Sequence, residues 1–267
     1  MTWGQFMAKQ RLLIVGAGGF GREVLAWAED IQTHGNVDWA IGGFLDANPR
    51  ALEKFDIELP VVGDPQSYAP RPEDRFVCAV GDPAIKLRLG RSLQQRGAKF
   101  VNLIHSTTLV GPRCRYGVGT ILCPFAALTV DVTLGDFVTI NMRANVGHDA
   151  VLGDGCTLNV FCDVTGAARL GTGVFLGSHA VVAPRTVVED WARIGAGSVA
   201  LRRVRANASV FGVPALRLDA PQLTQPVSPE QRADAGEPTE SETRTTLIHG
   251  STRTRSASEG VVKLRPR

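Results

Sequence analysis

The sequence predicts a small α/β domain followed by a parallel β-helix built from six-residue repeats. Two patterns predict the β-helix: an aliphatic residue recurs at every sixth position from Val110 to Ile194, and a small or β-branched residue follows each of them four positions later. Residues 9–104 lack this period and alternate between strand and helix patterns, which is typical of a parallel α/β unit. A period of six fits neither a helix nor a long alternating strand.

The repeat runs without interruption through fifteen hexads, and only Tyr116 departs from the aliphatic rule. Each hexad should form one short strand and one corner, so that three hexads close a coil of eighteen residues and fifteen make five coils. Residues eighteen positions apart should stand one above the other, about 4.8 Å apart. Gly often follows the aliphatic residue, and we expect it there because tight corners favour positive φ. The expected interior positions are Val110, Tyr116, Leu122, Leu128, Leu134, Ile140, Val146, Leu152, Leu158, Val164, Leu170, Leu176, Val182, Val188 and Ile194.

Composition narrows the class of protein. A formal net charge of +3 is too small to predict a nucleic-acid partner, and no segment predicts a bilayer span or a signal peptide. A cytoplasmic location is therefore expected. The five cysteines have no paired spacing, so we predict neither disulfides nor a metal site. Cys114, Cys156 and Cys162 fall on the small position of the repeat, which predicts a packing role.

The segment before the repeat predicts an α/β domain over residues 9–104. Its expected strands and helices are Arg11–Val15, a helix through Val24 and Ala28, Gly42–Asp46, Phe76–Val80, a helix over Lys86–Arg96, and Phe100–Ile104. The β-helix should follow over residues 105–218. Residues 219–267 are poor in apolar side chains and predict a disordered tail.

A glycine motif follows the first expected strand and opens the first expected helix. Gly16, Gly18, Gly19 and Gly21 form this turn, where backbone N–H groups and a helix N-terminus favour a phosphate group. Asp46 ends the next strand, where an acid can meet a ribose or a base. A tight turn without a ligand is the alternative. If a ligand binds, a nucleotide-sugar diphosphate is favoured over NAD, because the domain is about half of a full dinucleotide-binding fold.

His148 is the candidate general base. It lies two positions past an interior residue and should project outward near a corner, where an imidazole can accept a proton near neutral pH. Asp149 can orient the ring. A solvated corner histidine is the alternative, and spacing alone does not choose among the histidines; the others are His34, His105, His179 and His249.

Four segments together resemble one family: the GAGGFG turn, the GFLD strand, the NVGHD corner and the closing GVPA. Over residues 9–218 the chain resembles the sialic-acid O-acetyltransferase family of hexapeptide-repeat acyltransferases. Within it, the chain is similar to the bacterial N-acetyltransferases for nucleotide-linked 4-amino-6-deoxy sugars. The resemblance implies a left-handed β-helix, acetyl-CoA as co-substrate, no metal, a homotrimer, and a place in surface-glycan or lipopolysaccharide biosynthesis.

The resemblance also implies roles for individual residues. His148 matches the general base, Asp149 its supporting acid, and Asn141 a sugar contact. Gly166 lies one coil after His148, and its N–H would hold the thioester oxygen as charge develops. The chain departs from its relatives at Phe20 and at Thr157, where some of them carry histidine; Thr157 predicts a different hydrogen bond near the thioester.

The expected coenzyme groove continues beyond the base. Its corners are formed by Gly177 with Ser178 and by Gly195 with Ala196, while Arg202 and Arg203 would meet phosphates. A solvated terminal face is the alternative for the two arginines.

The predicted function is transfer of an acetyl group from acetyl-CoA to the amino group of a nucleotide-activated amino-deoxy sugar. Three alternatives stay open: O-acylation of a sialic acid or another sugar hydroxyl, a scaffold that has lost catalysis, and a nicotinamide oxidoreductase. The expected partners are the nucleotide sugar, coenzyme A and two further copies of the chain, with no nucleic acid and no membrane insertion.

Overall fold

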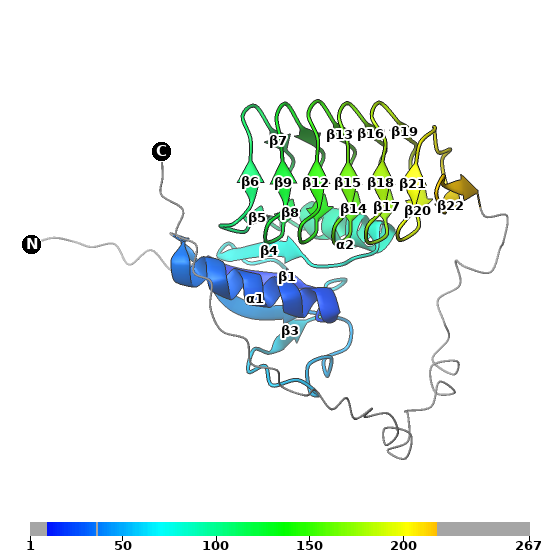
Figure 1. Cartoon of the computed structure of the whole chain (residues 1–267). Helices are drawn as coiled ribbons and strands as arrows, with labels where there is room; N and C mark the ends of the chain where they lie inside the picture. Colours follow the sequence, from blue (N-terminus) through cyan, green and yellow to red (C-terminus); the bar gives the residue numbers. More distant parts are fainter. Residues whose placement is uncertain (1–9, 36, 218–267) are drawn as a thin grey trace, which may run out of the picture. The chain divides into compact units, whose positions relative to one another are not determined.

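A computed structural model describes residues 10–35 and 37–217 of the chain (Figure 1). These residues all belong to one compact unit, Met1–Asp219; a second unit, Ala220–Arg267, lies outside the described residues, as does the tail expected over residues 219–267. None of the helices in the described part is long and apolar enough to cross a membrane.

The N-terminal part is a four-stranded parallel sheet with two helices, which confirms the α/β prediction. The strand order is β3-β2-β1-β4. The elements are β1 (Gln10–Val15), α1 (Gly19–His34), β2 (Trp39–Leu45), β3 (Val61–Gly63), β4 (Asp74–Cys78) and α2 (Pro83–Gln95). The strand β3 was not expected, because it is three residues long and lies among turns.

The C-terminal part is a parallel β-helix, as predicted, and Figure 1 shows its coils stacked along one axis. Its strands form a five-stranded, a six-stranded and an eight-stranded sheet. They are β5 (Leu103–Ile104), β6 (Leu109–Val110), β7 (Arg115–Tyr116), β8 (Ile121–Leu122), β9 (Ala127–Leu128), β10 (Thr133–Leu134), β11 (Thr139–Ile140), β12 (Asn145–Val146), β13 (Val151–Leu152), β14 (Thr157–Leu158), β15 (Asp163–Val164), β16 (Arg169–Leu170), β17 (Phe175–Leu176), β18 (Val181–Val182), β19 (Val187–Val188), β20 (Arg193–Ile194), β21 (Val199–Ala200), β22 (Ser209–Phe211) and β23 (Leu216–Arg217).

The register follows the eighteen-residue rule, as the pairing of Val146 with Val164 and with Leu128 illustrates. The expected interior residues from Leu122 to Ile194 are buried. Val110 and Tyr116 were predicted to be interior, but each is 37% exposed, because they lie in the first coil, where fewer neighbours cover them.

The repeat extends beyond the predicted range at both ends. Strand β5 pairs with β8 and so starts the β-helix within the segment expected to end the α/β domain. Strand β21 adds one hexad after Ile194. The last coil is shorter, since Ile194 pairs with Val210, sixteen residues later.

Positive φ does not explain the repeated glycine. The left-handed residue at each corner lies further along the turn and is often large, as at Phe125, Arg143 and Asp149. At the glycine position it is close approach that excludes a side chain: a Cβ on Gly147 would lie 2.8 Å from the nitrogen of Gly166 in the next coil. The expectation of positive φ at this position was therefore wrong, and backbone packing is the physical reason.

Helix α2 packs against the eight-stranded sheet and joins the two parts of the unit. Lys86 donates hydrogen bonds from Nζ to the hydroxyl groups of Thr139, at 3.0 Å, and Thr157, at 2.8 Å. Its third acceptor is the carbonyl oxygen of Cys156, at 3.2 Å. Asp82, which caps α2, also receives a hydrogen bond of 2.8 Å from Arg193 of the β-helix.

Candidate active site

His148 and Asp149 occupy the corner between β12 and β13. Asp149 takes the left-handed conformation there, at φ 60°, and its N–H donates to the carbonyl oxygen of Val130 in the preceding coil. Both side chains are well exposed, at 64% and 62%. The Nδ1 atom of His148 lies 2.7 Å from Oδ2 of Asp149. Because a carboxylate can only accept, this contact favours the proton on Nδ1 and leaves the Nε2 lone pair free to accept another.

Gly166 lies one coil beyond His148, and the imidazole ring covers it. A Cβ built on Gly166 would be 2.4 Å from Nε2 and 2.6 Å from Cε1 of His148, so any larger residue would displace the ring. Among residues 10–35 and 37–217, no acceptor bonds the N–H of Gly166. The structure therefore brings together a proton acceptor and a free backbone donor, the pair that acyl transfer requires.

The rival histidines have other surroundings. His105 is largely buried, with Nε2 3.0 Å from Asp30 and Nδ1 2.8 Å from the Thr107 hydroxyl. His179 stacks on Phe161 with ring centroids 4.8 Å apart. His34 lies on the exposed surface of α1 beside Asp30, and His249 is outside the described residues.

The corners of the β-helix form three edges with different side chains. The histidine edge joins the six-stranded to the five-stranded sheet; its turns are 111–114, 129–132, 147–150, 165–168 and 183–186. The aromatic edge joins the eight-stranded to the six-stranded sheet; its turns are 105–108, 123–126, 141–144, 159–162, 177–180 and 195–198. The third edge carries Phe137, which packs against Phe100 and faces the N-terminal domain.

The predicted site residues divide between two of these edges. His148, Asp149 and Gly166 lie on the histidine edge. The predicted coenzyme and sugar residues lie on the aromatic edge; they are Asn141, Gly177, Ser178, Gly195 and Ala196. The side-chain oxygen of Asn141 accepts the N–H of Met142 at 2.7 Å. A single chain does not bring the two sets together, because the six-stranded sheet separates them.

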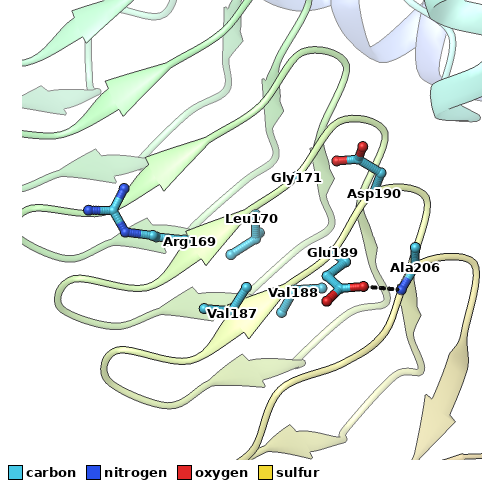
Figure 2. A pocket seen from close by; sticks show the side chains of 8 residues that line it. All are labelled: Arg169, Leu170, Gly171, Val187, Val188, Glu189, Asp190 and Ala206. Carbon is cyan, nitrogen blue, oxygen red and sulfur yellow. Dashed lines mark hydrogen bonds between the residues drawn. The ribbon is translucent and has the colours of Figure 1, made fainter.

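The predicted phosphate-binding arginines lie at the end of the β-helix. Arg203 forms an ion pair with Glu189, and Glu189 also accepts the N–H of Ala206 at 2.9 Å, as Figure 2 shows. Arg202 is exposed. A hollow of about 380 Å³ opens beside Glu189, between β16 and β19. It belongs to the five-stranded sheet and does not include His148.

The glycine turn has the geometry that the sequence predicts. Gly16 takes a φ of 99°, and a Cβ on Gly21 would lie 2.0 Å from the carbonyl oxygen of Gly16, so both glycines are required by backbone conformation and packing. At Gly18 and Gly19 a Cβ would meet no other described residue within 4 Å. No side chain of the described part of the chain caps α1, whose N-cap is Gly18. The turn therefore leaves open space above an uncapped helix N-terminus.

Strand order places this turn at a topological switch point. The chain runs from β1 through β2 to β3 on one side and then crosses to β4 on the other, and ligands bind at the carboxyl ends of such strands. Asp46 supports the turn: its Oδ2 accepts the N–H of Ala17 at 2.8 Å and its Oδ1 that of Asn48 at 2.9 Å. Direct contact of Asp46 with a ribose or base stays a prediction.

Lys86 was missed as a functional candidate. It is 1% exposed, and burial lowers the pKa of its amine to about 8. A signal was present, since Lys86 shares the buried face of α2 with Pro83, Leu87 and Gly90. The hydrogen bond predicted for Thr157 near the thioester is wrong, because the Thr157 hydroxyl accepts from Lys86 beneath α2.

Comparisons with known proteins agree with this fold. Residues 11–93 match the model of the PglD N-terminal domain family. A curated GDP-perosamine N-acetyltransferase of Escherichia coli O157:H7 is 25% identical over 206 residues, which are 74% of this chain and 81% of that protein.

Solved structures match a larger share of this chain than the curated relative does. PerB of Caulobacter crescentus, in complex with CoA and GDP-perosamine, is 29% identical with a TM-score of 0.71; the match covers 79% of this chain and 98% of that one. The acetyltransferase domain of PglB from Neisseria gonorrhoeae, in complex with acetyl coenzyme A, is 26% identical with a TM-score of 0.69, over 79% of this chain and all of the other. Over most of its length the chain is thus similar to a GDP-perosamine N-acetyltransferase and to solved structures that contain CoA with GDP-perosamine or acetyl coenzyme A.

Proposed function

We propose that this protein transfers an acetyl group from acetyl-CoA to the amino group of a nucleotide-linked amino sugar. The observation that carries the proposal is the stacking of the His148 ring on Gly166, whose N–H is free of acceptors among the described residues. One relative is a GDP-perosamine N-acetyltransferase, and the similar solved structures contain CoA with GDP-perosamine or acetyl coenzyme A.

We propose a role for each of these residues in the reaction. Nε2 of His148 accepts the proton that the sugar amine loses as its nitrogen bonds to the thioester carbon. The N–H of Gly166 donates to the thioester oxygen as this atom becomes negatively charged. Asp149 holds the ring and stabilises the imidazolium. When the carbon–sulfur bond breaks, the imidazolium returns the proton to the leaving thiolate, so that an amide and free CoA are formed.

We place the nucleotide at the carboxyl ends of β1 and β4. The open space at Gly18 and Gly19 and the uncapped start of α1 suit a diphosphate, which backbone N–H groups bind well. In this arrangement Asp46 shapes the turn through Ala17.

We also propose a homotrimer. The predicted coenzyme residues lie on the aromatic edge and His148 lies on the histidine edge, so one groove contains both sets only if the edges come from neighbouring copies. Leu109, on the outer surface of the six-stranded sheet between these edges, is 64% exposed. Three copies per particle are the outcome that sedimentation equilibrium should give.

The proposal also includes the location of the enzyme and the use of its product. A cytoplasmic enzyme would supply acetylated sugars for lipopolysaccharide or another surface glycan. O-acylation, as in sialic-acid O-acetyltransferases, is the second candidate, because the base and the backbone donor would serve a hydroxyl group equally well. Paired acceptors that carry an amine or a hydroxyl at the same sugar carbon would separate the two reactions.

Substitution of the base tests the proposal. Thiol release from acetyl-CoA would be followed with a panel of UDP-, GDP- and dTDP-linked amino sugars. His148→Ala should lower kcat by about a hundredfold or more, whereas His34→Ala, which changes an exposed histidine on α1, should leave it unchanged. Equal turnover by His148→Ala and the wild type would exclude the mechanism. Absence of both turnover and CoA binding in the wild type would favour a scaffold.

A further inference from the structure

The aromatic edge has a distinct charge pattern. Its six turns contain no aspartate or glutamate, and one of them contributes Arg143. The other two edges do carry acids: Asp131 and Asp149 lie on the histidine edge, and Asp136 and Asp154 lie on the edge that faces the N-terminal domain. Asp163, two residues after Phe161 in the next coil, belongs to the six-stranded sheet. An anionic ligand would therefore meet the least repulsion along the aromatic edge.

Arg143 is held between two aromatic rings of the neighbouring coils. Its guanidinium carbon lies 5.7 Å from the ring centroid of Phe125 and 5.5 Å from that of Phe161. Both rings are exposed, at 56% and 43%. These positions differ by eighteen residues, so the three side chains stand in one column along the edge. Contacts within about 6 Å of a ring centroid are attractive for a cation.

This kind of contact leaves the guanidinium donors available. Arg113, Arg193 and Arg203 direct their N–H groups to carboxylates. Arg143 has no ion pair or hydrogen bond from its side chain among the described residues. An aromatic face attracts the positive charge but accepts few of the N–H donors. The planar guanidinium group can therefore still donate two parallel hydrogen bonds to one oxyanion. Ordering by two rings also reduces the entropy that binding would otherwise cost.

We propose that Arg143 binds a phosphate group of a substrate, with Phe125 and Phe161 as positioning residues. The inference rests on the proposed function, which brings two phosphate-bearing molecules to this enzyme. The recognised chemistry is a phosphate or diphosphate oxyanion, carried either by the nucleotide sugar or by coenzyme A. Asn141 is in the same turn as Arg143, and the corners predicted for the coenzyme follow on the same edge.

The test compares KM values for substrates with and without phosphate. Arg143→Met removes the charge and the N–H donors, and Arg143→Lys keeps the charge but lacks the paired donors of the guanidinium group. Arg169→Met is the matched control, because Arg169 is an exposed arginine on the five-stranded sheet. We expect Arg143→Met to raise KM about tenfold or more for one phosphate-bearing substrate, with kcat within about twofold, and Arg143→Lys to fall between.

Two arms identify the source of the phosphate. A rise in KM for acetyl-CoA that is absent with acetyl-pantetheine assigns Arg143 to the coenzyme. A rise in KM for the nucleotide sugar that is absent with the free amino sugar assigns it to the nucleotide. Changes below about twofold in both KM values, or the same change with Arg169→Met, would overturn the proposal.

Measurements of ligand binding test the role of Arg143 independently of whether the protein catalyses acetyl transfer. CoA, GDP and UDP would be titrated into wild type and Arg143→Met at two salt concentrations. Weaker binding and a smaller salt dependence in the variant support Arg143 even if no acetyl transfer is found. Equal binding by both proteins, with turnover present, refutes only the role of Arg143. Phe161→Leu should raise KM less than Arg143→Met and add nothing to it in the double variant, because both changes affect one contact.

Discussion

The Nζ atom of Lys86 on α2 lies 2.8 Å from the Oγ1 atom of Thr157 in the β-helix and donates a hydrogen bond to it. This contact links the N-terminal α/β domain to the β-helix through a lysine that is 1% exposed. Its three oxygen acceptors satisfy the ammonium group, yet burial still lowers its pKa to about 8 from an ordinary value of 10.5. The interface between the two domains therefore contains a buried ammonium group, that of Lys86, whose charge depends on pH.

Stability should consequently rise with pH just above 8. Between the folded and unfolded pKa values of Lys86 the unfolded chain binds more protons, so the free energy of unfolding increases with pH by up to about 1.4 kcal/mol per unit. The burial of Cys78 and Cys156, which raises the pKa of each thiol to about 12 from 9.0, opposes this above pH 9.

Urea unfolding between pH 8 and 9 would measure the effect in wild type and in Lys86→Met. The variant should lack the lysine contribution to the slope, whereas Lys99→Met, at an exposed lysine, should retain it. Equal slopes in Lys86→Met and wild type would contradict a lowered pKa.

Asp149 should matter for kcat more than for substrate binding. Asp149→Asn removes the charge that stabilises the imidazolium, and we expect kcat to fall by about tenfold or more with KM little changed. Asp131→Asn is the matched control, because Asp131 takes the same left-handed corner position one coil earlier. Asparagine tolerates that conformation, so both variants should fold. Steady-state kinetics that show equal losses in the two variants would argue against a specific role for Asp149.

Gly166→Ala should impair catalysis without unfolding the protein. The new Cβ would lie 2.4 Å from Nε2 of His148, and the exposed ring can turn away at little cost in stability. We expect kcat to fall by about a hundredfold and Tm to change by less than about 4 °C. Ala167→Gly changes the next residue of the same corner and should leave kcat unaltered. Full activity in Gly166→Ala would show that the ring position is not required.

The two kinds of glycine in the N-terminal turn should respond differently to alanine. A Cβ on Gly21 would lie 2.0 Å from the carbonyl oxygen of Gly16, so Gly21→Ala should destabilise the domain by about 2 kcal/mol or more. Gly18→Ala has open space and should fold normally, but weaken binding of nucleoside diphosphates by bringing a methyl group toward the phosphates. Thermal unfolding and calorimetric titration would measure both. Tight diphosphate binding by a folded Gly18→Ala variant would move the nucleotide site elsewhere.

The sequence determined the β-helix and the stacking of the two residues proposed for catalysis. A six-residue period is a property of neighbours along the chain, and eighteen residues per coil were enough to predict that His148 and Gly166 stack. The same rule separates Gly177 from His148, because their spacing is not a multiple of eighteen, and the structure duly places Gly177 on the aromatic edge. The alternation of strands and helices likewise predicted the parallel sheet and its glycine turn.

Only the tertiary structure decided which surfaces meet. The burial of Lys86 against Thr139 and Thr157 joins residues more than fifty positions apart, and no local pattern encodes that distance. The contacts of Arg143 with Phe125 and Phe161 depend on the directions of these three large side chains at their corners, which the repeat alone does not predict. Periodicity fixes the path of the backbone, whereas docking of one domain on another depends on the shape and charge of faces that form only after each has folded.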